Sequence, residues 1–322
     1  LQQTENSKNC FQAPRGLMPA SFKVINKNGK ESLVADFGEK AIGRVTPVDS
    51  SLWWLLLMRM YIKASGDNDI AAEDRTCSSI KRILDHYLIG HFELIPTLLV
   101  PDGAFMIDRR MGMYGHPLDI EVLFDAALRS SREILGIDAS QDDKKYIKRI
   151  DDRIGYLVDH IRADYWIDPT RLNSIYRYET EQFGDEIANK YNIHVSSIPN
   201  WVYQWMPENS GYFLGNIGPG RMDFRFLTVG NLLAVLTSLA ERSQQKKILR
   251  LLEVNWEVLV GSMPIKLCYP ALEGKAWHML TGADGKNTSW SYHNGGNWPT
   301  LLWLLIAAAM KMNNKAMAIK AI

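Results

Sequence analysis

Polar side chains of the kinds that do chemistry lie in or directly beside four segments that are rich in glycine and aromatic residues: 36–51, 91–117, 199–223 and 262–299. These side chains are carboxylates, arginines, histidines, a tyrosine and an asparagine: Asp49, Asp108, Arg109, Arg110, His116, Asp223, Arg225, Glu273, Tyr292, His293 and Asn294. Tryptophans lie among or next to them, Trp53 included. Aromatic faces pack against apolar C–H groups while carboxylates and amides bind hydroxyls. This mixture indicates a site for a neutral, polyhydroxylated ligand.

Two of the carboxylates suit acid–base chemistry on such a ligand. Glycoside hydrolysis needs one protonated and one ionised carboxyl group. Burial against indoles, such as those of Trp53 and Trp54, would keep a proton on Asp49. Each candidate also has a structural interpretation: Asp49 as a helix N-cap, Asp108 as an ion-pair partner of a neighbouring arginine, Glu273 as a solvated loop residue, and His293 as a structural histidine. Motifs of other enzyme classes, such as G-x-S-x-G, the P-loop and H-E-x-x-H, are missing from the sequence.

The composition excludes several other classes of protein. The 322 residues are 46% hydrophobic and 23% charged, and the net charge is +1. We therefore expect neither a nucleic acid nor a membrane as partner. The three cysteines are widely separated, which favours a reducing compartment and gives no metal-ligand spacing. No metal or cofactor is predicted. The longest apolar run, 298–310, is too short to span a bilayer.

The segments that must position these residues are predicted to be helices of two kinds. Helices at 52–64, 223–239 and 300–311 are apolar almost all round, whereas those at 70–89, 142–164 and 244–260 are amphipathic. Alternation of enclosed and outer helices is the pattern of an α/α toroid. Since the four site-bearing segments each precede a predicted inner helix, they should converge on one rim. The sequence predicts an all-α fold, with 1–322 as a single domain.

Five motifs resemble those of the alkaline/neutral invertases, glycoside hydrolase family 100 of plants and cyanobacteria. They are RVTPVDSSLWW, TLLVPDGAFMIDRRMGMYGHP, GPGRMDFRFLTVGNL, CYPALEG and NTSWSYHNGGNWPTLLW, in that order. The resemblance implies an (α/α)6 barrel that hydrolyses sucrose without a metal or organic cofactor. It implies that Asp49 is the general acid and Glu273 the general base. The other polar residues named above, with Trp53, are implied to bind substrate.

The resemblance also sets expectations for the whole protein. Chains of this family extend further at both ends, so we expect a catalytic domain truncated at both ends and an incomplete barrel. A cytoplasmic enzyme is expected, or a plastid or mitochondrial one if a transit peptide precedes the chain, and a homo-oligomer is possible. Two alternatives stay open: another α/α-toroid disaccharide hydrolase of the trehalase type, and a catalytically silent sugar-binding relative. Asp108 is the alternative to Asp49 as the acid.

Overall fold

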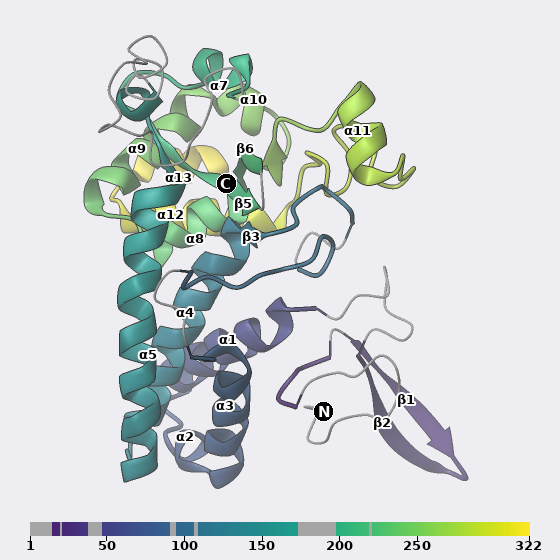
Figure 1. Ribbon diagram of the computed structural model, residues 1–322, viewed down its shortest axis with the longest axis vertical. Helices are drawn as coiled ribbons and strands as arrows, with labels where there is room; N and C mark the ends of the chain where they lie inside the picture. Colours follow the sequence, from purple (N-terminus) through teal and green to yellow (C-terminus); the bar gives the residue numbers. More distant parts are fainter. Residues whose placement is uncertain are drawn as a thin grey trace. The chain divides into compact units, whose positions relative to one another are not determined.

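The computed structural model describes residues 15–19, 21–37, 47–90, 95–105, 109–172, 198–218 and 221–322. The chain divides into two compact units (Figure 1). The first unit contains Leu1–His116 and Ile120–His160, and the second contains Pro117–Asp119 and Ile161–Ile322. Segments 36–51 and 91–117 thus fall almost entirely in the first unit, and segments 199–223 and 262–299 fall in the second.

The first unit combines a β-hairpin with helices. Strands β1 (Ser21–Lys27) and β2 (Lys30–Asp36) pair antiparallel around an Asn28–Gly29 turn with positive φ at both positions. That is the turn geometry that fits the twist of a two-residue hairpin. The helices are α1 (Asp49–Ser65), α2 (Asp69–Ala72), α3 (Asp74–Tyr87), most of α4 (Leu118–Leu135) and α5 (Gln141–His160).

Helix α1 confirms the helix expected at 52–64. It ends at Gly66, whose left-handed backbone lets its N–H bind the carbonyl of Ile62. The predicted enclosure is not observed, because Leu57 and Met60 are each more than half exposed. An apolar side of α1 therefore faces solvent in this chain.

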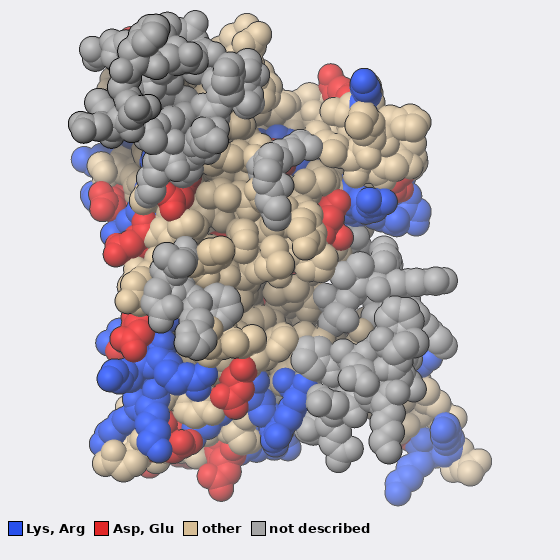
Figure 2. Space-filling view, viewed as in Figure 1, with Lys and Arg blue, Asp and Glu red and all other residues tan. Residues whose placement is uncertain are grey.

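The amphipathic helices of the first unit also agree with expectation. The helix expected at 70–89 forms as α2 and α3, interrupted at Glu73, whose backbone is extended. The one expected at 142–164 forms as α5 and continues as the π-helix η2 (Ile161–Tyr165) in the second unit. Ion pairs join neighbouring helices, for example Lys81 with Asp142 at 2.6 Å. Accordingly, basic and acidic side chains lie next to one another on the face shown in Figure 2.

The second unit is organised around a twisted antiparallel sheet. Its strands run in the order β3 (His116–Pro117), β5 (Tyr212–Gly218), β6 (Arg221–Leu227) and β7 (Cys268–Tyr269), and β4 (Trp166–Ile167) pairs with β5. The helices of this unit are α7 (Asn200–Trp205), α8 (Thr228–Leu236), α9 (Arg242–Val254), α10 (Trp256–Leu259), α11 (Gly274–Thr281), α12 (Thr300–Lys311) and α13 (Lys315–Ala321).

Helix α8 lies at the centre of this unit. Its residues from Thr228 to Val235 are all buried, and α12 packs against it. The amphipathic helix predicted at 244–260 forms as α9 and α10, and a capping box between Glu241 and Gln244 begins α9. Helix α12 confirms the prediction at 300–311, but Trp303 is 76% exposed, so this helix too is not enclosed.

The all-α prediction is wrong where the chain forms strands. The helix expected at 223–239 is strand to Leu227 and helix only from Thr228. The run MDFRFLTVGNLLAVL is mostly apolar, and its first five residues alternate between apolar and polar, which fits a strand, before the apolar stretch of the helix. Pairing of β6 with β5 and β7 decides in favour of the strand. The prediction is confirmed only in that the chain is mainly helical, since it also contains a sheet.

Candidate functional site

Asp49 lies at the beginning of α1, in a setting that favours its protonated form. It occupies the first helical turn, and Val48 rather than Asp49 is the N-cap residue, so the N-cap interpretation is wrong. Burial raises the pKa of Asp49 to about 6, while a hydrogen bond to its own backbone acts in the opposite direction. With such a pKa, a fraction of the molecules carries a protonated Asp49 near neutral pH, as a general acid requires.

Tyr87 of α3 fixes the backbone around this carboxyl. The Tyr87 hydroxyl donates to the Val48 carbonyl at 2.8 Å and lies 2.8 Å from Oγ of Ser51. Both Tyr87 and Ser51 are buried. Burial raises the pKa of Tyr87 to about 12, and the charge of Asp49 adds to the shift, so the phenol remains a donor. Tyr87 thereby binds a residue on each side of Asp49, Val48 before it and Ser51 after it.

The second site-bearing segment of this unit is hydrogen-bonded to the first. The Val48 N–H donates to the Ala104 carbonyl at 2.8 Å. Further along the segment, the carboxylate of Asp102 accepts hydrogen bonds from the backbone N–H groups of Met111 and Gly112, both at 2.9 Å. A backbone hydrogen bond therefore joins the PVDSSLWW and VPDGAFMIDRRMG motifs, which lie about 50 residues apart in the sequence.

The other predicted residues of the first unit have different surroundings. Trp53 is half-buried one helical turn after Asp49, on the same face of α1. Arg109 is half-buried and Arg110 is exposed. His116 is half-buried, with Nδ1 at 3.0 Å from the Leu98 carbonyl, and burial lowers its pKa, which favours the neutral ring. Asp108, the alternative acid, lies outside the described residues.

Glu273, in the second unit, is an exposed carboxylate held by an indole. It directly precedes α11, and its side chain does not cap that helix. Instead, Nε1 of Trp290 donates a hydrogen bond to its Oε1 at 2.5 Å. The residue is thus solvated, as the structural interpretation expected, and yet fixed in direction, which that interpretation did not include.

A hydrogen-bonded frame holds the backbone next to Glu273. The fully buried side chain of Asn294 accepts from the Leu272 N–H at 2.6 Å and donates to the Leu272 carbonyl at 2.9 Å. Oγ of Ser289 also donates to that carbonyl, at 2.7 Å. Asn294 was predicted to bind substrate, but in this structure its amide joins the ALEG and WSYHNGG motifs. These hydrogen bonds fix the backbone directly before Glu273.

The neighbouring residues Tyr292 and His293 stack on one another. Their ring centroids are 4.1 Å apart with an interplanar angle of 18°, and Trp298 continues the stack 5.2 Å from His293. Tyr292 is 40% exposed, whereas His293 is almost fully buried. Tyr292 is therefore accessible to a ligand, while His293 lies behind it.

Asp223 and Arg225 are two residues apart on β6 and point to the same side of the sheet. Nε of Arg225 lies 2.9 Å from both carboxylate oxygens of Asp223, and both side chains are 5% exposed. A buried pair of this kind stabilises only when both partners are present. Next to it, burial raises the pKa of the Cys268 thiol to about 11. The predicted substrate contacts at Asp223 and Arg225 thus form an internal ion pair here.

Aromatic rings join the two site-bearing segments of the second unit. Tyr269, four residues before Glu273, stacks on Trp205 with centroids 5.0 Å apart and lies edge-on to Trp201 at 6.0 Å. Its ring is 5.9 Å from Trp290. Trp201, Tyr269 and Trp290 retain exposed surface. The segments 199–223 and 262–299 therefore share an aromatic cluster beside Glu273.

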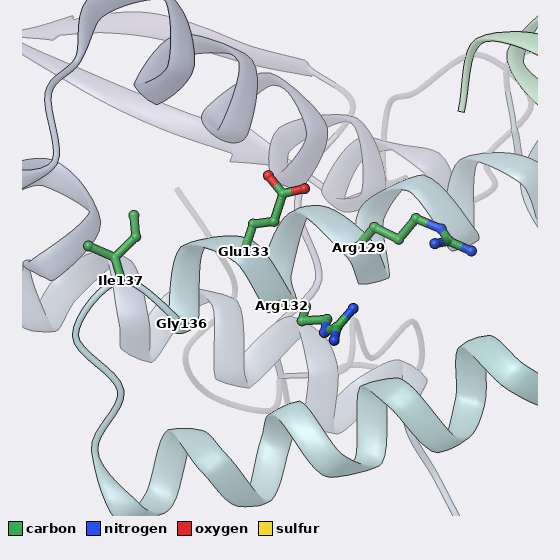
Figure 3. Close-up of a pocket in the computed structure, with 5 residues that line it drawn as sticks. All are labelled: Arg129, Arg132, Glu133, Gly136 and Ile137. Atoms are coloured by element: carbon green, nitrogen blue, oxygen red, sulfur yellow. The ribbon is translucent and has the colours of Figure 1, made fainter. Parts of the chain in front are cut away.

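A cavity lies in the first unit. It has a volume of about 310 Å³ and is lined by Arg129, Arg132, Glu133, Gly136 and Ile137, at the C-terminal end of α4 (Figure 3). The Glu133 carboxylate and the Arg132 guanidinium point to different sides of the helix, and each pairs with an oppositely charged residue of the first unit. No predicted site residue lines this cavity.

The described residues contain neither a metal-binding cluster nor a membrane-spanning helix. Among residues 15–322 outside the gaps given above, no cluster of three or more His, Cys, Asp or Glu side chains is arranged to hold a metal ion. Within the same residues, no helix has both the length and the apolar character to cross a membrane.

Each unit therefore assembles half of the predicted rim. Hydrogen bonds join segments 36–51 and 91–117 around Asp49, and an aromatic cluster joins 199–223 and 262–299 beside Glu273. Convergence of the two halves, with Asp49 opposite Glu273, stays a prediction. Sequence reasoning missed the roles of Tyr87 and Trp290. The only available signal was that Trp290 belongs to a loop unusually rich in aromatic and glycine residues.

Comparisons with known proteins agree with these motifs. The family model described as alkaline and neutral invertase matches residues 1–322. The probable alkaline/neutral invertase A, chloroplastic, of Arabidopsis thaliana is 48% identical over all of this chain and 52% of its own length. The mitochondrial neutral/alkaline invertase 1 and the cytosolic invertase 1 of Oryza sativa subsp. japonica are each 47% identical over all of the chain, covering 52% and 57% of the relatives. The chain thus spans little more than half the length of these relatives.

Among solved structures, a GH78 family rhamnosidase of Bacillus sp. GL1 aligns with a TM-score of 0.48 at 15% identity. The alignment covers 86% of this chain and 21% of the rhamnosidase.

Proposed function

Because the chain belongs to the alkaline and neutral invertase family, we propose that the protein hydrolyses sucrose to glucose and fructose, with Asp49 as general acid and Glu273 as general base. The observation that carries this proposal is the contrast between the two carboxyl groups. Burial raises the pKa of Asp49 to about 6, whereas Glu273 is exposed and accepts an N–H hydrogen bond.

The proposed reaction needs no group from outside the protein except water. Asp49 gives its proton to the glycosidic oxygen as the bond from that oxygen to the anomeric carbon breaks. Glu273 takes a proton from a water molecule as the water oxygen bonds to the same carbon. We propose inversion of that carbon, which requires the carboxyl groups to stand about 6.5–9.5 Å apart so that the water fits between them.

The remaining substrate contacts are assigned by exposure. Trp53, Arg109, Arg110, His116 and Tyr292 each retain accessible surface and are proposed to bind the sugar hydroxyls and ring faces. Asp223, Arg225, His293 and Asn294 are buried, which supports a role in holding the loops rather than in touching sucrose. Asp108 is proposed as a contact on its motif alone.

For the whole protein we propose the (α/α)6 barrel, with 1–322 supplying part of one catalytic domain. Helix α8, which is buried from Thr228 to Val235, and the amphipathic α9 support alternation of inner and outer helices. The sheet of the second unit is then an addition on the rim of the barrel. A cytoplasmic, plastid or mitochondrial location is compatible with the named relatives, and a homo-oligomer remains a proposal.

The test is sugar release by the intact protein from a panel of sucrose, trehalose, maltose and cellobiose, with glucose and fructose assayed separately. Equimolar glucose and fructose from sucrose alone is the expected result. Cleavage of trehalose in preference to sucrose would assign the protein to another toroid hydrolase. Calorimetric binding of sucrose without turnover would make it a silent relative. Either outcome overturns the proposal.

A further inference from the structure

Trp290 has a backbone conformation that tryptophan rarely adopts. Its φ is +64°, in the left-handed region that is unfavourable for a residue with a large side chain. Such conformations persist only where the surroundings enforce them. Here Oγ of Ser291 donates to the Thr288 carbonyl at 2.8 Å and lies 2.7 Å from Oγ1 of Thr288, which closes the turn around Trp290.

The same turn is fastened to the chain at Glu273. Ser289, directly before Trp290, donates to the Leu272 carbonyl, directly before Glu273. A side chain on Gly295 would come within 3.1 Å of the Trp290 ring, so the glycine allows the loop to pass close to the indole. The backbones of residues 272 and 289 are thus held at a fixed separation, and the indole N–H spans it to reach Oε1 of Glu273.

Glu273 needs such a partner because it is exposed. A solvated glutamate has three rotatable bonds and loses rotamer entropy when it is held in one direction. Tryptophan has two side-chain torsions and presents one N–H donor at the rim of a rigid ring. A charge-assisted hydrogen bond from that donor occupies Oε1 and leaves Oε2 available.

We propose that Trp290 is the positioning residue of the general base. It holds Oε1 of Glu273 so that Oε2 points at the hydrolytic water. This inference rests on the proposed function, since it takes Glu273 as the base. The left-handed backbone at Trp290 is the conformation that brings the indole N–H to that oxygen.

A competing role for Trp290 is a platform on which a sugar ring stacks, because its ring is 40% exposed. Trp290→Phe separates the two roles, since phenylalanine keeps an aromatic face and lacks the N–H. A positioning residue acts on the chemical step, so kcat of the intact protein should fall by about 10- to 100-fold with KM within twofold of wild type. A rise in KM with unchanged kcat would overturn the proposal.

The matched control is Trp277→Phe. Trp277 lies on α11, one helical turn after Glu273, and its Nε1 donates to the Asn287 carbonyl at 2.8 Å rather than to the Glu273 carboxylate. This variant loses an indole hydrogen bond of similar length and should keep the kcat of wild type. If both variants lose kcat equally, Trp290 acts only through loop stability and the proposal fails.

A double-mutant cycle tests whether Trp290 acts through Glu273. In a Glu273→Gln background, Trp290→Phe should lower the residual kcat no further, because the carboxylate it positions is already gone. Losses that multiply would overturn the inference. If Glu273→Gln alone retains wild-type activity, it is the proposed function that fails, and the two failures are therefore distinguishable.

A second substitution covers the case in which Trp290→Phe does not fold. Incorporation of 3-benzothienylalanine at position 290 keeps the shape of the bicyclic ring and replaces the N–H by sulfur. The same loss of kcat is expected with an unchanged melting temperature. Wild-type kcat in this variant would contradict the proposal.

Discussion

The surroundings of Asp49 and Glu273 differ in almost every physical respect. Asp49 begins a long helix and is withdrawn from water, whereas Glu273 lies in a loop, is exposed and accepts an indole N–H. The positive end of a helix dipole favours a carboxylate by about 0.3–1 kcal/mol. The pKa shift of Asp49, from 3.8 to about 6, corresponds to about 3 kcal/mol in the opposite direction. Desolvation therefore prevails, and it favours the protonated form of Asp49.

The largest expected effect comes from removing either carboxyl group. Asp49→Asn and Glu273→Gln should each lower kcat of the intact protein by about 10²- to 10⁴-fold, the range typical of general acid–base groups. Both changes keep shape and hydrogen bonding, so the melting temperature should not fall. Steady-state kinetics on sucrose measures the effect.

Asp108→Asn is the comparison variant for this experiment. If it abolishes turnover while Asp49→Asn remains active, the roles of acid and substrate contact must be exchanged. Near wild-type activity of Glu273→Gln would remove that residue from the role of base.

A second prediction concerns how stability changes with pH in the first unit. The pKa of Asp49 is higher in the folded chain than in the unfolded chain, so between about pH 4 and pH 6 the unfolded state binds fewer protons. Stability therefore falls as pH rises through this window. Asp49→Asn removes the cost of ionisation and should raise the free energy of unfolding at pH 7 by about 3 kcal/mol, with little gain at pH 4.

Denaturant melts of both forms at pH 4 and pH 7 measure this difference. An equal effect of the substitution at the two pH values would mean that Asp49 is not desolvated, and the contrast with Glu273 would disappear.

The smallest expected effect tests how the first turn of α1 is held. Tyr87→Phe removes the donor to the Val48 carbonyl and leaves the buried Ser51 hydroxyl with one partner fewer. A cost of about 1 kcal/mol in unfolding free energy is expected, with a change of a few fold in kcat. Tyr146→Phe is the matched control, since its hydroxyl bonds to Asp85 at an exposed position. Equal effects of the two substitutions on kcat would show that Tyr87 has no special relation to Asp49.

Some of these elements could be predicted from the sequence and others could not. Helix α1 was recognisable because a polar Asp-Ser-Ser before an apolar run is typical of a helix start, and the apolar run at 300–311 located α12 correctly. Strand β6 was missed because only five residues, Met222–Phe226, alternate between apolar and polar before the apolar run of α8, and so short an alternation does not exclude a helix. Its identity depends on pairing with β5, which a local pattern does not encode.

The bond between Trp290 and Glu273 was unpredictable for a different reason. It joins residues 17 positions apart through a left-handed backbone at Trp290. No propensity favours that conformation for tryptophan, and the surrounding hydrogen bonds impose it. Likewise, the internal pairing of Asp223 with Arg225 depends on their burial, which two charged residues on a strand do not reveal by themselves.

The most direct test of the central claim, that Asp49 and Glu273 act as one acid–base pair, is their separation in a crystal structure of the intact protein. The two carboxyl groups should face each other about 6.5–9.5 Å apart, the spacing of inverting glycosidases. A separation of about 5 Å would indicate a retaining mechanism with Glu273 or Asp49 as nucleophile. Carboxyl groups that do not face a common cavity would contradict the pairing altogether.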